Sequence, residues 1–221
     1  MTFLLDPYAA RSCPVKTFNA FDPGTPKPEK PLDESLLEAF SGGSEFRDSM
    51  LKALCRAADV VDLRGEKNPT ETLDAMGAGA SVIIGGTLPA DEQGHRVGSP
   101  DALVRGSDRP GGRPGYWPLR VKPYRLLEKQ RNAKELRTSR LVSPTVLEPL
   151  PGYRFRSYRQ GVLLELAHHW RLLQACGRSA STAIVGSIGF DDRTRGLIVW
   201  VPLELRFLRT FSRTSPSGHR L

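Results

Sequence analysis

An aspartate and a lysine hold the positions in this chain that best suit chemistry. Asp101 opens one short apolar run, 102–104, and Lys122 closes the next, 119–121. Residues 106–115 between the runs are almost all Gly, Pro, Arg and Asp, which favours a hairpin loop. Two adjacent antiparallel strands would bring both side chains to one sheet edge. A carboxylate that holds Mg²⁺ beside an ammonium group that orients water suits attack on a phosphodiester.

The string Pro100-Asp101, a spacer and a strand that ends in Lys122 resembles the PD-(D/E)xK nucleases, in particular their RecB-like branch. The resemblance implies hydrolysis of DNA phosphodiester bonds with Mg²⁺ or Mn²⁺. It makes Asp101 the chief metal ligand, Val121 a carbonyl ligand, and Lys122 the group that activates water or stabilises the phosphate. The branch places an acid two residues before the lysine, and here that position holds Arg120.

Two helices carry further positions of this resemblance. Next to Phe46 the expected acid is replaced by Arg47, and Glu45 is the nearest substitute as a metal ligand. An acid in the first turn of a helix is also explained by the helix dipole alone. On the helix that follows the lysine, the Gln and Tyr positions of the family hold Glu165 and His169. The resemblance implies a catalytic role for Glu165 and a DNA contact for His169; the alternative is a solvent-exposed pair one turn apart.

The most charged segment follows Lys122. From Arg120 to Arg140 the chain has eight basic residues and two acidic ones. Beside a phosphodiesterase-like site, such an excess would neutralise backbone phosphates and make binding depend strongly on salt. The alternative is a solvated helix, in which only Arg131 and Glu135 would form an ion pair. We expect nucleic acid to contact six of these residues, here called the basic stretch: Arg125, Lys129, Arg131, Lys134, Arg137 and Arg140.

Composition narrows the class of protein. The formal net charge of +8 favours an anionic partner such as nucleic acid. No apolar run approaches the length of a membrane span, and the first residues lack the pattern of a signal peptide. The three cysteines are widely spaced, which indicates reduced thiols, a cytoplasmic location and no iron–sulfur cluster. We expect Cys13, which precedes a proline, to be a small buried residue.

The pattern of elements predicts an α/β fold. We expect helices over 7–12, 33–40, 44–58, 70–76 and 157–176, strands over 60–63, 81–88, 101–105 and 117–122, and a hairpin of 183–188 with 197–201. From the 44–58 helix onward, the order resembles the αβββαβ core of restriction-endonuclease-like folds, a central mixed β-sheet flanked by helices. Three regions are expected: an N-terminal segment with a Pro-rich linker (1–32), a nuclease-like domain (33–202) and a basic, flexible tail (203–221). Family members continue past this hairpin, so we expect a C-terminal truncation.

Three functions are compatible with these observations. The first is a metal-dependent DNA nuclease with a role in DNA repair, acting on single-stranded DNA or free ends, with a helicase or repair partner left open. The second is a nucleic-acid-binding module with a nuclease-like fold and an impaired site, because arginines hold two positions where acids are expected. The third is a basic structural subunit, which would show no salt-sensitive binding to DNA.

Overall fold

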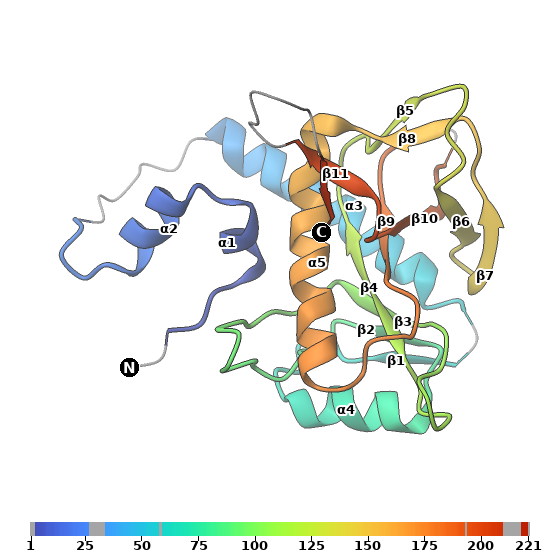
Figure 1. Ribbon diagram of the computed structural model, residues 1–221, viewed down its shortest axis with the longest axis horizontal. Helices are drawn as coiled ribbons and strands as arrows, with labels where there is room; N and C mark the ends of the chain where they lie inside the picture. Colours follow the sequence, from blue (N-terminus) through green and yellow to red (C-terminus); the bar gives the residue numbers. More distant parts are fainter. Residues whose placement is uncertain (1–2, 27–33, 58, 193, 210–217, 221) are drawn as a thin grey trace.

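The computed structural model describes residues 3–26, 34–57, 59–192, 194–209 and 218–220, with side chains for 3–26, 41–57, 59–192 and 194–205 (Figure 1). Its helices are α1 (Pro7–Arg11), α2 (Pro14–Phe21), α3 (Glu34–Leu54), α4 (Pro69–Ala78), the short 3₁₀ helix η1 (Ser157–Arg159) and α5 (Gln160–Ala175). Its strands are β1 (Val60–Asp62), β2 (Val82–Ile84), β3 (Ala102–Arg105), β4 (Tyr116–Val121), β5 (Leu127–Lys129), β6 (Arg137–Arg140), β7 (Ser143–Pro149), β8 (Tyr153–Phe155), β9 (Ile184–Ile188), β10 (Leu197–Pro202), β11 (Arg206–Arg209) and β12 (Gly218–Arg220).

One mixed sheet of eight strands organises the chain, in the order β1-β2-β3-β4-β9-β10-β6-β7. Strands β2, β3 and β4 are antiparallel neighbours, and β9 returns parallel to β4 after the helix α5. Parallel neighbours need a crossover connection, and α5 supplies it. The predicted α/β class and the order α3, β2, β3, β4, α5, β9 are therefore confirmed.

The central strands bury both of their faces. On one face Ile83 and Leu103 pack with Met76 of α4 and with the end of α5. On the other face the alternate residues pack in one cluster with Leu51 and Leu54 of α3. Helices therefore flank the sheet, as Figure 1 shows for α4 and α5. None of the helices in the described residues is long and apolar enough to cross a membrane.

The sheet is strongly curled. Strand β7 stands at the end of the strand order, yet it comes into contact with β3, which lies on the other side of β4, β9, β10 and β6. Twist accumulates from strand to strand and brings distant strands of a large sheet together in this way. The curl gives the sheet a concave face between β4, β9, β10, β6 and β7.

The helix α3 is continuous where two helices were predicted. Residues 41–43 were expected to break it, but the helix runs through both Gly42 and Gly43. A glycine in a helix costs roughly 1 kcal/mol relative to alanine, which packing can offset. At Gly43 an added Cβ would lie 3.3 Å from Cγ of Pro123, so the glycine lets α3 approach the segment that follows Lys122.

Several boundaries differ from prediction for identifiable reasons. Pro14 does not merely stop a helix; it is the first residue of α2, where its missing N–H is not needed. The helix α4 continues past Gly77 and ends at Gly79, whose φ of 81° suits glycine. The segment 120–140, which carries the basic stretch, forms the strands β5 and β6. The alternative of a solvated helix is therefore wrong.

The two ends of the chain are only partly described. Residues 27–31 of the predicted Pro-rich linker and residues 210–217 and 221 of the predicted tail lie outside the described residues. Within the tail, β11 and β12 form an antiparallel pair that the sequence did not predict. At the other end, the backbone of Leu5 is hydrogen-bonded to that of His95 and Val97, and α1 packs on α5.

Candidate functional site

The structure places Asp101 and Lys122 on one face of neighbouring strands. Ala102 pairs with Leu119 across β3 and β4, so Asp101 precedes β3 just as Lys122 follows β4. Side chains alternate along a strand, which puts Arg120 and Lys122 on the same face as Asp101. Asp101 is 2% exposed, and the Lys122 side chain is 12% exposed. The predicted juxtaposition is therefore confirmed.

The buried carboxylate of Asp101 is fully engaged by donors. Its Oδ2 accepts a hydrogen bond of 2.7 Å from the backbone N–H of Val121. Its Oδ1 accepts from Nε of Arg47 at 2.6 Å and from Nη1 of Arg120 at 3.2 Å. Arg47 comes from α3, so this carboxylate joins the helix to the two central strands.

A second buried carboxylate, Glu165 of α5, faces the same group of cations. Its Oε2 accepts from Nζ of Lys122 at 2.7 Å, and its Oε1 lies 2.9 Å from Nε of Arg11. Nε of Arg120 lies 3.4 Å from the same Oε2, which is close enough for an ion pair, although this atom has no hydrogen bond of proper geometry. Arg120 therefore lies between the two carboxylates.

These six side chains carry more positive than negative charge. Four cations surround two carboxylates, and one of the cations, Arg47, is also 3.8 Å from the exposed Asp48. Guanidinium groups keep their charge at every accessible pH. The site should therefore attract an anion and repel a cation. We call this set the charged cluster: Arg11, Arg47, Asp101, Arg120, Lys122 and Glu165.

The residues predicted to hold Mg²⁺ do not make a cation site. Val121 contributes its N–H to Asp101. Glu45 is exposed on α3, and no contact joins it to Asp101 in the described part of the chain. No group of three or more His, Cys, Asp or Glu side chains among the described residues could hold a metal. Mg²⁺ needs several oxygen ligands, and here arginines occupy the space around the one aspartate.

His169 is a fully buried polar residue near the cluster. The ring is 0% exposed, and neither nitrogen has a hydrogen bond within the described residues. Burial, followed by the charges of Arg120, His168 and Lys122, lowers the pKa of His169 well below its ordinary value of 6.5. The imidazole ring of His169 is therefore neutral at neutral pH. Burial also lowers the pKa of Lys122, against the opposing effect of its bond to Glu165.

This burial corrects two expectations for α5. Glu165 and His169 were weighed as DNA-facing residues or as a solvated pair, but both are buried. The ring of His169 packs against Gly98, where an added Cβ would lie 3.1 Å from Nε2. The predicted contact between His169 and nucleic acid is incompatible with this position, because the ring does not reach the surface.

The basic stretch is at the surface but is not uniform. All six of its residues are exposed, on β5, on β6 and on the segments beside them. Arg125 forms a 2.8 Å ion pair with the exposed Asp192, which reduces its free charge. Arg137 turns instead toward a pocket of the curled sheet. Four members retain the predicted exposure without such a competing role: Lys129, Arg131, Lys134 and Arg140.

The expectation that Cys13 is buried is wrong. Its thiol is exposed at the start of α2, because α2 has no buried residue and lies outside the core. The backbone N–H groups of Lys16 and Val15 lower the pKa of this thiol. Cys55 and Cys176 are also free thiols.

Sequence reasoning identified Arg47 and Arg120 as arginines near Asp101 that replace acids and repel a cation, and it missed Arg11. The available signal was that arginines hold both positions where the resemblance expects acids. Two such replacements predict cationic side chains close to the one aspartate. No local signal pointed to Arg11, because it meets Glu165 only through the packing of α1 on α5.

We predict that Glu165→Gln destabilises the fold by about 3 kcal/mol, because it leaves Lys122 and Arg11 without their buried anionic partner and leaves Arg120 with Asp101 alone. The matched control is Glu128→Gln, which breaks the more exposed pair with Arg154 and should cost less than about 1 kcal/mol. Urea unfolding at neutral pH measures both. Equal losses for the two variants would contradict a stabilising charged cluster.

We also predict that stability falls as the pH drops below about 6.5. With a lowered pKa in the folded state, His169 binds fewer protons there than in the unfolded chain, so acid favours unfolding. One such group contributes at most about 1.4 kcal/mol per pH unit. His169→Leu should flatten the dependence of unfolding free energy on pH, whereas His95→Asn, at an exposed position, should leave it unchanged. Unchanged slopes in both variants would show that other groups cause the acid sensitivity.

Comparison with protein-family models, with curated proteins and with solved structures gave no match. The RecB-like resemblance therefore stands on the residues quoted for it, chiefly Asp101 and Lys122 in an αβββαβ order.

Proposed function

We propose that this protein is a nucleic-acid-binding module with a nuclease-like fold, in which arginines take the place of the metal ion. One observation carries the proposal: Arg120 lies between Asp101 and Glu165, with its Nη1 3.2 Å from the first and its Nε 3.4 Å from the second. In a PD-(D/E)xK site this position would hold an acid. A guanidinium group there supplies positive charge without a metal and binds phosphate oxygens well.

An open cleft next to the charged cluster provides room for a strand of nucleic acid. Its volume is about 1030 Å³, and it is lined by Arg47, Asp48, Ser49 and Lys52 of α3, by Asp62 at the end of β1, and by Arg64, Gly65 and Gly85. The cleft adjoins Asp101, since Arg47 contacts that carboxylate. Lys52 is exposed and has no ion pair in the described part of the chain. Three basic and two acidic side chains line the cleft, and basic side chains in such grooves contact the backbone of single strands.

We infer single-stranded DNA, or DNA with free ends, as the ligand. The net charge of +8 and the exposed members of the basic stretch favour a polyanion. A basic structural subunit would need no excess of cations around two buried carboxylates beside an open cleft. We also propose a cytoplasmic location, on the basis of free thiols and of a DNA ligand.

A metal-dependent DNA nuclease is the second candidate. The observation that favours it is the placement of Asp101 and Lys122 on one face of neighbouring strands, within an αβββαβ order. The residues around Asp101 do not fit Mg²⁺ as they stand, so we derive no hydrolytic step. A role in DNA repair belongs to this candidate.

We predict that DNA binding weakens steeply with salt and does so without divalent metal. Replacing Lys129, Arg131, Lys134 and Arg140 by alanine should lower affinity and reduce the salt slope by about one unit for each lost phosphate contact. The measurement is fluorescence anisotropy of a labelled single-stranded oligonucleotide in EDTA at several salt concentrations. The matched control replaces four exposed basic residues elsewhere, and it has the same change in charge: Lys16, Arg56, Arg113 and Arg171. If both quadruple variants bind alike, the basic stretch is only a solvated surface.

We predict that Arg120→Glu creates a metal site. It would place three carboxylates together and remove the guanidinium, so Mg²⁺ should raise the melting temperature of the variant and allow cleavage of single-stranded DNA. Arg120→Gln is the control, because it removes the cation without adding an acid. Wild type should show neither effect.

The two candidates give opposite results in this assay. Robust Mg²⁺-dependent cleavage by the wild type, unaltered in Arg120→Glu and lost in Asp101→Ala, would overturn the binding module in favour of the nuclease. Glu45 would then be the first residue to test as the missing acid.

A further inference from the structure

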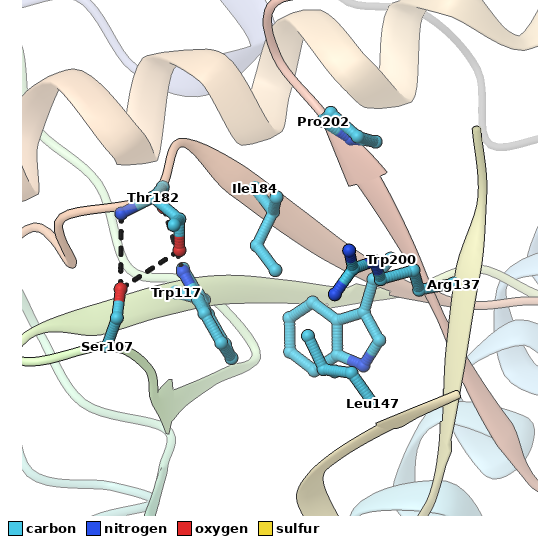
Figure 2. Close-up of a pocket in the computed structure, with 8 residues that line it drawn as sticks. All are labelled: Ser107, Trp117, Arg137, Leu147, Thr182, Ile184, Trp200 and Pro202. Carbon is cyan, nitrogen blue, oxygen red and sulfur yellow. Dashed lines mark hydrogen bonds between the residues drawn. The ribbon is translucent and has the colours of Figure 1, made fainter. Parts of the chain in front are cut away.

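A second pocket lies on the concave face of the curled sheet and shares no residue with the charged cluster (Figure 2). Its volume is about 310 Å³, at the lower end of the range for pockets that bind small molecules. The strands β4, β6, β7, β9 and β10 contribute to it, together with the loop residues Ser107 and Thr182. Its apolar lining consists of Trp117, Leu147, Ile184, Trp200 and Pro202.

Two tryptophans make a rigid apolar wall. Their ring centroids are 5.3 Å apart and their planes are tilted by 58°. The indole N–H of Trp117 donates to the carbonyl of Thr182, and that of Trp200 donates to the hydroxyl of Ser139. Opposite Trp200 the chain has Gly186, where an added Cβ would lie 2.6 Å from the ring. Both indole N–H groups therefore already donate hydrogen bonds within the protein, and the part of the pocket lining that the indoles form is apolar.

Arg137 is the one charged residue among the described residues that line this pocket. Arg137 pairs directly with Trp200 across β6 and β10, so the two side chains share the concave face. Figure 2 shows its guanidinium group directed into the pocket, between Ile184 and Trp200. Within the described part of the chain, the side chain of Arg137 makes no hydrogen bond or ion pair. The hydroxyls of Ser107 and Thr182 at the rim are hydrogen-bonded to each other at 3.0 Å.

We propose that this pocket binds a small organic carboxylate with an aromatic or branched apolar body. The body would contact the partly exposed side chains of Leu147, Ile184 and Pro202, which lie around the buried indoles, and the carboxylate would accept two hydrogen bonds from the guanidinium group of Arg137. A base of single-stranded DNA fits less well, because stacking needs an exposed ring face, whereas Trp200 is 0% and Trp117 5% exposed.

The test uses 3-phenylpropionate and its uncharged analogue 3-phenylpropanamide as probes. Nuclear magnetic resonance of the ¹⁵N-labelled protein reports on the indole N–H groups of the three tryptophans. The acid should shift the signals of Trp117 and Trp200 and leave that of Trp170, which lies outside the pocket, unchanged. The amide should bind at least about tenfold more weakly, because it lacks the charge-assisted hydrogen bonds.

Variants assign the preference to Arg137. In Arg137→Gln the acid should lose its advantage over the amide, whereas Arg140→Gln, at an exposed position on the same strand, should retain it. Leu147→Phe should weaken both probes by narrowing the pocket. Absence of shifts at millimolar acid, equal affinity for acid and amide in the wild type, or a preference that survives Arg137→Gln would overturn the proposal. A single-stranded oligonucleotide that shifts the same two signals, when the acid does not, would also overturn it and assign the pocket to nucleic acid.

Discussion

Two buried carboxylates on different elements need positive charge, and the guanidinium group of Arg120 lies between them. Asp101 and Glu165 are both almost inaccessible to water, where an unpaired carboxylate would be strongly destabilising. Arg120 meets one with Nη1 and approaches the other with Nε. The central strands and α5 are therefore held at one separation, and Arg11 and Arg47 complete the neutralisation from α1 and α3.

Under the proposed function, this arrangement would let a nuclease-like order of elements bind nucleic acid without a metal ion. A fold carries many functions, and the residues at the site decide among them. A metal ion bridges carboxylates with a double positive charge and can leave. An arginine does so with a single charge, stays attached to the chain and cannot be deprotonated. Under the proposed function, two such arginines around Asp101 would favour a phosphate over a cation.

Local patterns were sufficient for the parts of the fold that depend on neighbours in sequence. The hairpin of β3 and β4 follows from two apolar runs and a Gly- and Pro-rich loop, and α5 follows from its apolar stripe. To predict that Asp101 and Lys122 share a face, it was enough to know that side chains alternate along a strand.

Other parts depended on contacts between distant segments. The continuity of α3 through Gly43 depends on Pro123, which no local pattern indicates. The strand β6 has a polar sequence and no apolar alternation. Its buried hydroxyls are satisfied by other elements, since Thr138 donates to the carbonyl of Ile198 and Ser139 accepts from Trp200. The same limit hid the partner of Arg11, which meets Glu165 only through the packing of α1 on α5.

The N-terminal segment packs on the domain that carries the charged cluster, so it belongs to the same structural unit. A boundary near residue 32 would separate α1 and α2 as an appendage, yet Leu5 is bonded to the backbone of His95 and Val97, and Arg11 neutralises Glu165. A shortened protein that starts after α1 would retain the whole sheet but lose one of the cations that balance its buried acids. Expression of a minimal domain, or fusion of a tag close to α1, would thus alter the electrostatics of the site itself.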